Sequence, residues 1–226
     1  MTRKSILFSP GDRLELLQKA ANSAADTVVF DLEDAVRPDQ KDFARDTVRE
    51  VLADSSVTPH TEVAVRLNAG TATETDLDSI ADTPPDAVMV PKVSSASDIT
   101  RTADLMADRG LDCSILALVE SATGILNAPA IAEEDSTSAL VFGAEDFATN
   151  IGATRTTDGT ELLYARERVI LAAAAAEVDA IDTVYTDFDN IEGLRQDAKF
   201  ALKLGFEGKL AIHPKQVSVI NEAFTP

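Results

Sequence analysis

The sequence predicts a single-domain (β/α)8 TIM barrel. Eight short apolar runs alternate with helical segments along the 226 residues. Most of these runs are hydrophobic throughout, which is typical of parallel strands that helices cover on the outside. No Gly/Ser/Pro-rich linker divides the chain, and no Gly-rich dinucleotide turn supports the competing doubly wound open sheet. We therefore expect one barrel domain over residues 1–226.

The predicted strands follow one another at spacings that leave room for a helix between neighbours. They are Ser5–Pro10, Thr27–Asp34, Glu62–Asn68, Asp86–Lys92, Ser114–Glu120, Ser138–Asp146, Asp179–Asp187 and Lys209–Pro214. The helical segments between them are DRLELLQKAANSA, DQKDFARDTVREVLA, ETDLDSIAD, ASDITRTADLMADRG, GILNAPAIAEE, GTELLYARERVILAAAAAEV and NIEGLRQDAKFALKLG. Several of these segments have Asp or Ser near the start and Gly at the end, as helix capping predicts.

Composition excludes several classes of protein. The chain has 20 basic and 39 acidic residues, a net charge of −19, which argues against a nucleic-acid partner. A run of about 18 apolar residues is absent, so we expect no membrane span. One cysteine, Cys113, excludes an internal disulfide, and the start MTRKSILFSP is not a signal peptide, so we expect a cytoplasmic protein. The acids are scattered, and this favours an acidic, halophilic type of surface.

Ionisable side chains gather at the carboxyl ends of most predicted strands. Because these ends share one mouth in a barrel, we expect the side chains to lie together. Carboxylates from different strands suit Mg²⁺, which takes one or two protein carboxylates together with waters and substrate oxygens. An internal salt-bridge network without a metal accounts for the pattern equally well. The residues are Asp31, Glu33, Asp34, Arg66, Asn68, Lys92, Glu120, Glu145, Asp146 and His213.

Three other features are less informative about function. The turn before the first helix and His213 each have two interpretations, and His60 has no expected role in the reaction. The turn SPGD leads to Arg13 and Lys19, which suit a phosphate-bearing ligand or form a capped turn with a solvated helix face. His213 is either a base at the mouth or a hydrogen-bonded residue that stops a strand. His60 precedes the third strand, at the opposite end of the barrel, and we expect it at the surface.

Eight motifs follow one another along the chain: RKSILFSPGDRLELLQKAA, ADTVVFDLEDAVRPDQKDFAR, VRLN, VMVPKV, ALVESATGI, VFGAEDFATNIGA, LLYARERVILAA and GFEGKLAIHPKQV. Taken in order, these motifs resemble the citrate lyase beta subunit family, within the HpcH/HpaI-type aldolases and the malyl-CoA or citramalyl-CoA lyases. The resemblance covers nearly the whole chain. It implies a Mg²⁺-dependent lyase that splits a 3-hydroxyacyl-CoA, such as malyl-CoA, methylmalyl-CoA or citramalyl-CoA, into a 2-oxo acid and an acyl-CoA.

The resemblance also implies roles for single residues. Glu120 of LVES and Asp146 of GAED match ligands of Mg²⁺, for which Mn²⁺ is a possible substitute. Arg66 of RLN matches an arginine that stabilises the thioester enolate. The other implied roles are catalysis for Glu33 and Asp34 beside the metal, binding of substrate or CoA for Arg13, Lys19 and Lys92, and support for Glu145 and His213.

Several alternatives stay open on the sequence alone. In the family's CoA lyases a segment beyond the barrel brings an acid/base aspartate to a neighbouring subunit, and this sequence ends at VINEAFTP. If that segment is absent, Glu33, Asp34 or His213 is the candidate acid/base. A citryl-thioester lyase subunit, a malyl-CoA thioesterase or malate synthase-like enzyme, and a non-catalytic barrel are the other interpretations. The resemblance also implies a homo-oligomer, a trimer or a hexamer.

Overall fold

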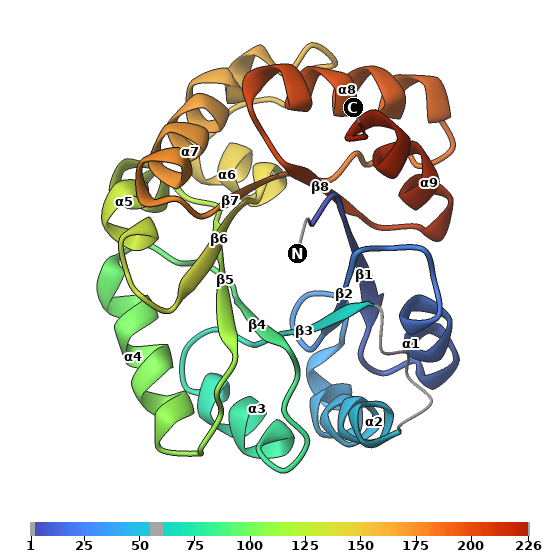
Figure 1. Ribbon diagram of the computed structural model, residues 1–226, viewed down its shortest axis with the longest axis vertical. Coiled ribbons are helices and arrows are strands. Elements are labelled where there is room, and N and C mark those ends of the chain that lie inside the picture. Colours follow the sequence, from blue (N-terminus) through green and yellow to red (C-terminus); the bar gives the residue numbers. More distant parts are fainter. Residues whose placement is uncertain (1–2, 55–60, 226) are drawn as a thin grey trace.

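The computed structural model describes residues 3–54 and 61–225 and forms a closed barrel of parallel strands. Neighbouring strands follow the order of the chain, and β1 (Ser5–Pro10) pairs with β8 (Gly208–Ala211) to close the sheet (Figure 1). The predicted (β/α)8 barrel is therefore confirmed. The prediction for His60 lies outside the described residues.

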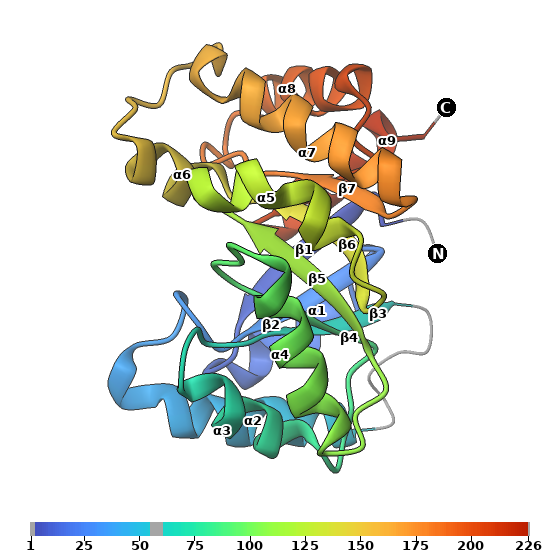
Figure 2. The same cartoon turned by 90° about the vertical axis from the view of Figure 1, so that its left-hand side faces the viewer.

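The helices form a ring around the barrel. Figure 2 shows α7 and α8 on one flank of the strands and α2 and α3 on the opposite flank. One short helix, α6, follows β6 directly and was not among the predicted helical segments. The helices are α1 Leu14–Ala21, α2 Lys41–Ala53, α3 Ala72–Ile80, α4 Ala96–Ala107, α5 Ala122–Ala132, α6 Ala144–Ile151, α7 Leu163–Ala176, α8 Ile191–Leu204 and α9 Pro214–Ala223, with 3₁₀ turns η1 Pro38–Gln40 and η2 Thr160–Leu162.

Seven of the strands, all except β1, end earlier than the sequence predicts. The remaining strands are β2 Thr27–Asp31, β3 Glu62–Arg66, β4 Ala87–Val90, β5 Ser114–Val119, β6 Thr137–Phe142 and β7 Asp179–Asp182. The prediction that Glu145 and Asp146 end a strand is wrong, because both lie in the first turn of α6. Acidic side chains stabilise the first turn of a helix, whose free N–H groups carry partial positive charge.

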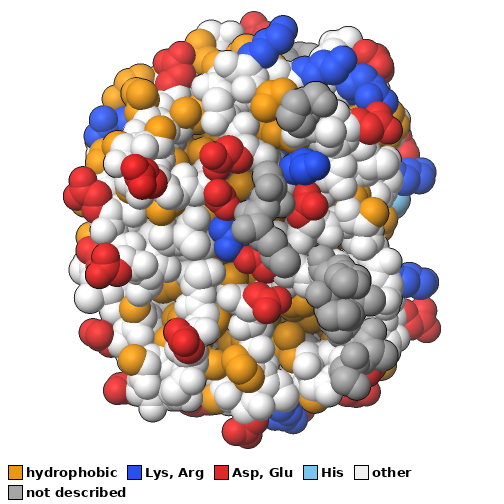
Figure 3. Space-filling view, viewed as in Figure 1, with side chains coloured by type: hydrophobic (Ala, Val, Ile, Leu, Met, Phe, Trp, Pro, Cys, Tyr) orange, Lys and Arg blue, Asp and Glu red, His pale blue; other side chains and the backbone are white. Residues whose placement is uncertain are grey.

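Acidic side chains are spread over the surface. On the face shown in Figure 3, Asp and Glu lie scattered among uncharged residues rather than in one patch. Within the described part of the chain, no helix combines the length and the apolar character that a membrane span needs.

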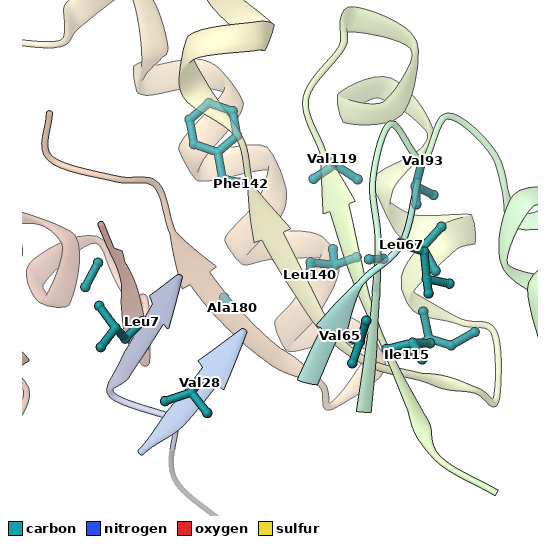
Figure 4. Close-up of a cluster of buried hydrophobic side chains, with 14 of the residues drawn as sticks. Leu7, Val28, Val65, Leu67, Val93, Ile115, Val119, Leu140, Phe142 and Ala180 are labelled. Carbon is teal, nitrogen blue, oxygen red and sulfur yellow. The ribbon is translucent and has the colours of Figure 1, made fainter. Parts of the chain in front are cut away.

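The core has two layers, because successive side chains of a strand point to opposite faces. One layer fills the space between the barrel and its helices, and Figure 4 shows part of it. The other fills the interior of the barrel, where Val29, Ala64, Leu118, Val141 and Ile181 pack together. The residue two positions after each of these points the same way. These later residues therefore face the mouth of the barrel.

Candidate active site

A cavity of about 410 Å³ lies at the carboxyl ends of the strands. Its inner wall is formed by residues that lie two positions beyond the interior residues of the strands and point the same way. Its outer wall comes from the loops and from the first turn of α6. The lining residues are Phe8, Pro10, Asp31, Asp34, Ala35, Arg66, Leu118, Glu120, Gly143, Ala144, Glu145, Asp146, Thr183, Val184, Leu210 and Ile212.

Arg66 is the cation on the wall of this cavity. It is opposite Asp31 in the register of β2 and β3, and its Nε and Nη2 donate to the two Asp31 oxygens at 2.7 and 2.6 Å. The guanidinium lies 5.0 Å from the centre of the Phe8 ring. Burial alone lowers the pKa of Arg66, yet the hydrogen bonds and charge of Asp31 raise it above its usual value. Arg66 is therefore held rigidly as a cation.

Glu33 is buried beside Arg66 and lies in ion pairs on both of its oxygens. Arg66 Nη1 is 3.1 Å from Oε2, and Lys92 Nζ is 2.9 Å from Oε1. Neither contact has the geometry of a hydrogen bond. Burial raises the pKa of Glu33, and the positive charges of Arg66 and Lys92 oppose this rise. Asp34 is 60% exposed and lies 3.6 Å from Arg66 at the cavity wall.

Glu120 directly follows β5 and projects into the cavity. Only 7% of it is exposed, and its Oε1 accepts the backbone N–H of Lys92 at 2.8 Å. Burial raises the pKa of Glu120 to about 7, the Lys92 N–H opposes the rise, and the charges of Asp146 and Glu33 add to it. The charge of Arg66 also opposes the rise, but among the described residues Glu120 forms no ion pair that would offset its burial.

The chain leaves room around Glu120 at one specific position. A Cβ on Gly143 would lie 2.7 Å from both Cβ and Oε2 of Glu120, so any other residue there would displace the carboxylate. One residue later α6 begins, and its first N–H, of Ala144, donates to Thr183 Oγ1 at 3.1 Å. This contact fixes the start of the helix whose first turn carries Asp146.

These residues fit a bound Mg²⁺. Glu120 follows β5, Asp146 lies in the first turn of α6, and both line one cavity, where Glu120 has no ion pair among the described residues. Among the described residues, no group of three or more His, Cys, Asp and Glu side chains is gathered as a metal site. A pair of carboxylates is nevertheless the usual protein share for Mg²⁺, which retains waters and takes substrate oxygens. Glu120 and Asp146 are the residues that would hold it.

Three of the residues for which the resemblance implies a role lie neither in the lining of the cavity nor in the ion pairs beside it. Arg13 is 68% exposed beside Asp12 at the start of α1, and Lys19 lies on the exposed side of the same helix. His213 caps α9, because its Nδ1 accepts the backbone N–H of Lys215 at 3.1 Å. Its ring stacks on Phe188, with centroids 5.1 Å apart. The observed contacts of His213 are thus those of a residue that stops a strand and begins a helix.

Glu145 lines the cavity beside Asp146, but its carboxylate pairs with Arg155 at 2.9 Å. The structure therefore brings six predicted residues to one mouth together with Glu145. The six are Glu33, Asp34, Arg66, Lys92, Glu120 and Asp146.

Sequence reasoning missed two residues that shape the site. Asp31 was recognised as a strand end without a role, yet it holds Arg66 through two hydrogen bonds. Thr183, which anchors the first turn of α6, was not singled out at all. The signal for Asp31 was its position, because an inward-facing acid opposite an inward-facing arginine on the next strand implies a pair.

Comparison with known proteins identifies the family of this chain. Residues 4–214 match the family described as HpcH/HpaI aldolase/citrate lyase. The chain belongs to this family. It is 39% identical to a citrate lyase subunit beta-like protein of Deinococcus radiodurans, over 99% of this chain and 80% of that protein.

Two further relatives have names that specify a substrate. The (3S)-malyl-CoA thioesterase of Cereibacter sphaeroides is 37% identical over 99% of this chain and 77% of its own length. The mitochondrial citramalyl-CoA lyase of Mus musculus is 35% identical over 99% of this chain and 72% of its own length. The predicted family resemblance is thus confirmed.

A solved structure has the same fold. Protein CitE of Mycobacterium tuberculosis, in complex with magnesium, acetoacetate and coenzyme A, superposes with a TM-score of 0.87 at 35% identity. The match covers all of this chain and 82% of that one. In that relative, a barrel of this kind holds both magnesium and a CoA.

Proposed function

We propose that this protein is a Mg²⁺-dependent carbon–carbon lyase that splits a 3-hydroxyacyl-CoA thioester into a 2-oxo acid and an acyl-CoA, or joins them. Malyl-CoA, methylmalyl-CoA and citramalyl-CoA are the candidate substrates. One observation carries the proposal: Glu120 and Asp146 share a cavity with the buried Arg66. A dication site and a fixed guanidinium are the two positive charges that the cleavage of such a thioester requires.

Each side chain has a task in this reaction. Glu120 and Asp146 would hold Mg²⁺, which would supply a Lewis acid for the oxygens of the 2-oxo acid. Arg66 stabilises the negative charge that develops on the thioester oxygen, because Asp31 orients its guanidinium and keeps it charged. Glu33 lies behind Arg66 and supports it.

The general base that takes up the 3-hydroxyl proton is the Asp34 carboxylate in this proposal. It lines the cavity and is 60% exposed, whereas Glu33 is enclosed between Arg66 and Lys92. His213 is the weaker candidate because its Nδ1 already accepts a helix N–H. An Asp34→Asn variant should lose turnover and retain Mg²⁺ affinity.

A panel of thioesters tests the proposed function. Malyl-CoA, methylmalyl-CoA, citramalyl-CoA and a citryl thioester are each incubated with the protein, with and without Mg²⁺, and the 2-oxo acid is measured. We expect Mg²⁺-dependent release of glyoxylate or pyruvate. The proposal is wrong if no thioester yields a 2-oxo acid, which is also the outcome that a non-catalytic barrel predicts.

A second candidate is hydrolysis of the thioester, as the name of the Cereibacter sphaeroides relative suggests. The same carboxylates and arginine suit this reaction if water reaches the thioester carbonyl. Free malate indicates hydrolysis, and glyoxylate with acetyl-CoA indicates cleavage. A malate synthase-like activity gives free malate from glyoxylate and acetyl-CoA. Cleavage of the citryl thioester alone indicates a citrate lyase beta-type subunit.

The remaining predictions concern assembly, environment and CoA. We propose one barrel domain, a cytoplasmic homotrimer or hexamer, and CoA phosphates near Arg13 and Lys19, whose side chains are exposed. Sedimentation measures the assembly, and Lys19→Ala should raise KM for the thioester.

The net charge of −19 supports a protein adapted to salt. Unfolding at low and molar KCl tests this, since equal stability in both contradicts it.

A further inference from the structure

Lys92 has a backbone conformation that its residue type disfavours. Its φ is 56°, in the left-handed region, where residues other than glycine are crowded. Across residues 3–54 and 61–225, Glu177 is the one other non-glycine residue with positive φ, at 58°. Glu177 is the C-cap of α7, where this conformation is common. Lys92 lies between β4 and α4, away from any helix C-terminus, so its conformation needs another explanation.

The conformation directs two successive N–H groups toward the same neighbour. The N–H of Lys92 donates to Glu120 Oε1 at 2.8 Å, and the N–H of Val93 donates to the Leu118 carbonyl at 3.1 Å. In an extended strand, successive N–H groups point to opposite sides. A left-handed residue at this point is what lets both groups reach β5 and the residue that follows it.

The side chain of Lys92 makes a separate contact. Its Nζ is 2.9 Å from Oε1 of Glu33, which is only 6% exposed and whose other ion pair is with Arg66. Glycine adopts this φ without steric cost. The chain has a lysine here instead, and the contact that a glycine could not make is the ion pair with Glu33.

We propose that Lys92 is a positioning residue that joins the two halves of the site. Its backbone N–H orients Glu120, and its ammonium balances the buried Glu33 carboxylate beside Arg66. Lys92 thus acts through two other side chains and need not touch the substrate. The part of this inference that concerns turnover rests on the proposed lyase function, whereas the part that concerns Glu120 is tested by metal binding alone.

The backbone contribution is tested by comparing Lys92→Gly with Lys92→Val. Both variants lack the ammonium, but only glycine accepts the left-handed conformation, which a β-branched residue strongly resists. Calorimetric titration with Mg²⁺ should show that Lys92→Gly binds as tightly as the parent or more tightly, because a nearby positive charge is gone. Lys92→Val should bind about tenfold more weakly than Lys92→Gly.

Glu177→Gly and Glu177→Val are the matched controls. They make the same exchange at a helix end away from the cavity, so they should shift Tm in the same directions and leave Mg²⁺ affinity unchanged. If the parent binds Mg²⁺ and the two Lys92 variants bind it equally well, the backbone role of Lys92 is wrong. If the parent binds no Mg²⁺, the proposed function fails, and the orientation of a metal ligand by Lys92 fails with it.

The side-chain contribution is tested by comparing Lys92→Met with Lys92→Arg. Loss of the ammonium should lower kcat about tenfold with little change in KM, because the interaction acts on the site rather than on bound thioester. Lys92→Arg should recover part of this loss, since it restores a cation beside Glu33. An increased KM with unchanged kcat in Lys92→Met would instead make Lys92 a CoA contact and overturn its positioning role.

Discussion

Two clusters of charged side chains, each with buried members, are built from similar residue types but differ in their balance of charge. The helix-side cluster, between β7, β8, α7 and α8, has two cations and two carboxylates. Its members are Arg166, Asp182, Asp197 and Lys209. The mouth cluster has two cations and five carboxylates. Its members are Asp31, Glu33, Asp34, Arg66, Lys92, Glu120 and Asp146.

The helix-side cluster pairs every charge that it buries. Arg166 donates to both oxygens of Asp182 at 2.9 and 2.6 Å, and Lys209 Nζ lies 2.7 Å from Asp182 and 2.6 Å from Asp197. Burial alone raises the pKa of Asp182, yet the charges of Lys209 and Arg166 hold it below its usual value. This cluster is complete without a ligand.

The mouth cluster, in contrast, does not pair every charge that it buries. Asp31 is saturated by Arg66, but Glu120 has only one backbone N–H, and its pKa is raised to about 7. Burial of unpaired carboxylates is unfavourable, so a protein retains them where a ligand supplies the missing charge. Charge balance, rather than burial itself, therefore separates a structural cluster from a site that binds a cation.

Removal of a proposed metal ligand should have the largest effect. Glu120→Ala and Asp146→Ala should each lower Mg²⁺ affinity by about 10³-fold or more, because two carboxylates are the whole protein contribution to the site. Calorimetry measures this, and Glu50→Ala, which removes an exposed carboxylate on α2, is the control. Parent-like affinity in both variants would remove the metal from the mouth cluster.

A substitution in the helix-side cluster should lower the stability of the protein and leave its Mg²⁺ affinity unchanged. Asp182→Asn leaves Arg166 and Lys209 buried with too little negative charge, which should cost about 3–5 kcal/mol of the free energy of unfolding. Urea unfolding measures the loss, and Mg²⁺ affinity of the folded variant should stay close to that of the parent. Asp189→Asn, at an exposed ion pair, is the control. A stable Asp182→Asn protein would show that the clusters do not differ in this way.

The raised pKa of Glu120 predicts a pH dependence of the metal-free protein. Below pH 4.5 both the folded and the unfolded chain hold the proton, so Glu120 does not penalise folding there. As pH rises toward about 7, only the folded chain keeps the proton, and the free energy of unfolding falls. Above that pH the penalty is complete, at most about 3 kcal/mol.

Glu120→Gln removes the ionisation and should be more stable than the parent at pH 8 but equally stable at pH 4. Urea unfolding with a chelator at both values measures the difference. Added Mg²⁺ should stabilise the parent at pH 8 and leave the variant unchanged. A variant that is no more stable than the parent at pH 8 would mean that Glu120 already has a counter-charge within the protein.

A substitution that crowds Glu120 without changing the charge of the mouth should have the smallest effect on Mg²⁺ affinity. Gly143→Ala places a Cβ 2.7 Å from Glu120 Oε2, so the carboxylate must move. We expect Mg²⁺ affinity to fall about tenfold, within the range for residues that orient a ligand. Gly110→Ala, where no atom lies within 4 Å of the added Cβ, controls for the general cost of replacing a glycine. Unchanged affinity in Gly143→Ala would show that Glu120 adapts freely.

The fold was largely predictable because uninterrupted apolar runs separated by capped helices are the pattern of a parallel barrel. The ends of the strands were not predictable to the residue. A strand ends where its neighbour stops offering hydrogen bonds, and α6 begins directly after Gly143 although the apolar run leads on to Glu145. The mouth itself was predictable, since strand ends in a barrel converge whatever their exact length.

The partners within each cluster could not be predicted. Asp182 and Lys209 were part of two predicted strands, and Arg166 was part of a helical segment. Their pairing depends on which side of the barrel each faces, and this needs the register of β7 and β8. His213 was predicted at the mouth from its place at a strand end, but its ring nitrogen accepts the N–H of Lys215 and caps α9. Position in the sequence alone does not distinguish these two roles.

Proton release on metal binding tests the account most directly. At pH 6, titration of Mg²⁺ into the parent in buffers of different ionisation enthalpy should show release of about one proton per ion, from Glu120. At pH 8 the release should largely disappear, and Glu120→Gln should release no proton at either pH. Equal Mg²⁺ binding by the parent and Glu120→Gln at pH 6, without proton release, would contradict the claim that the mouth cluster lacks a cation which Mg²⁺ supplies.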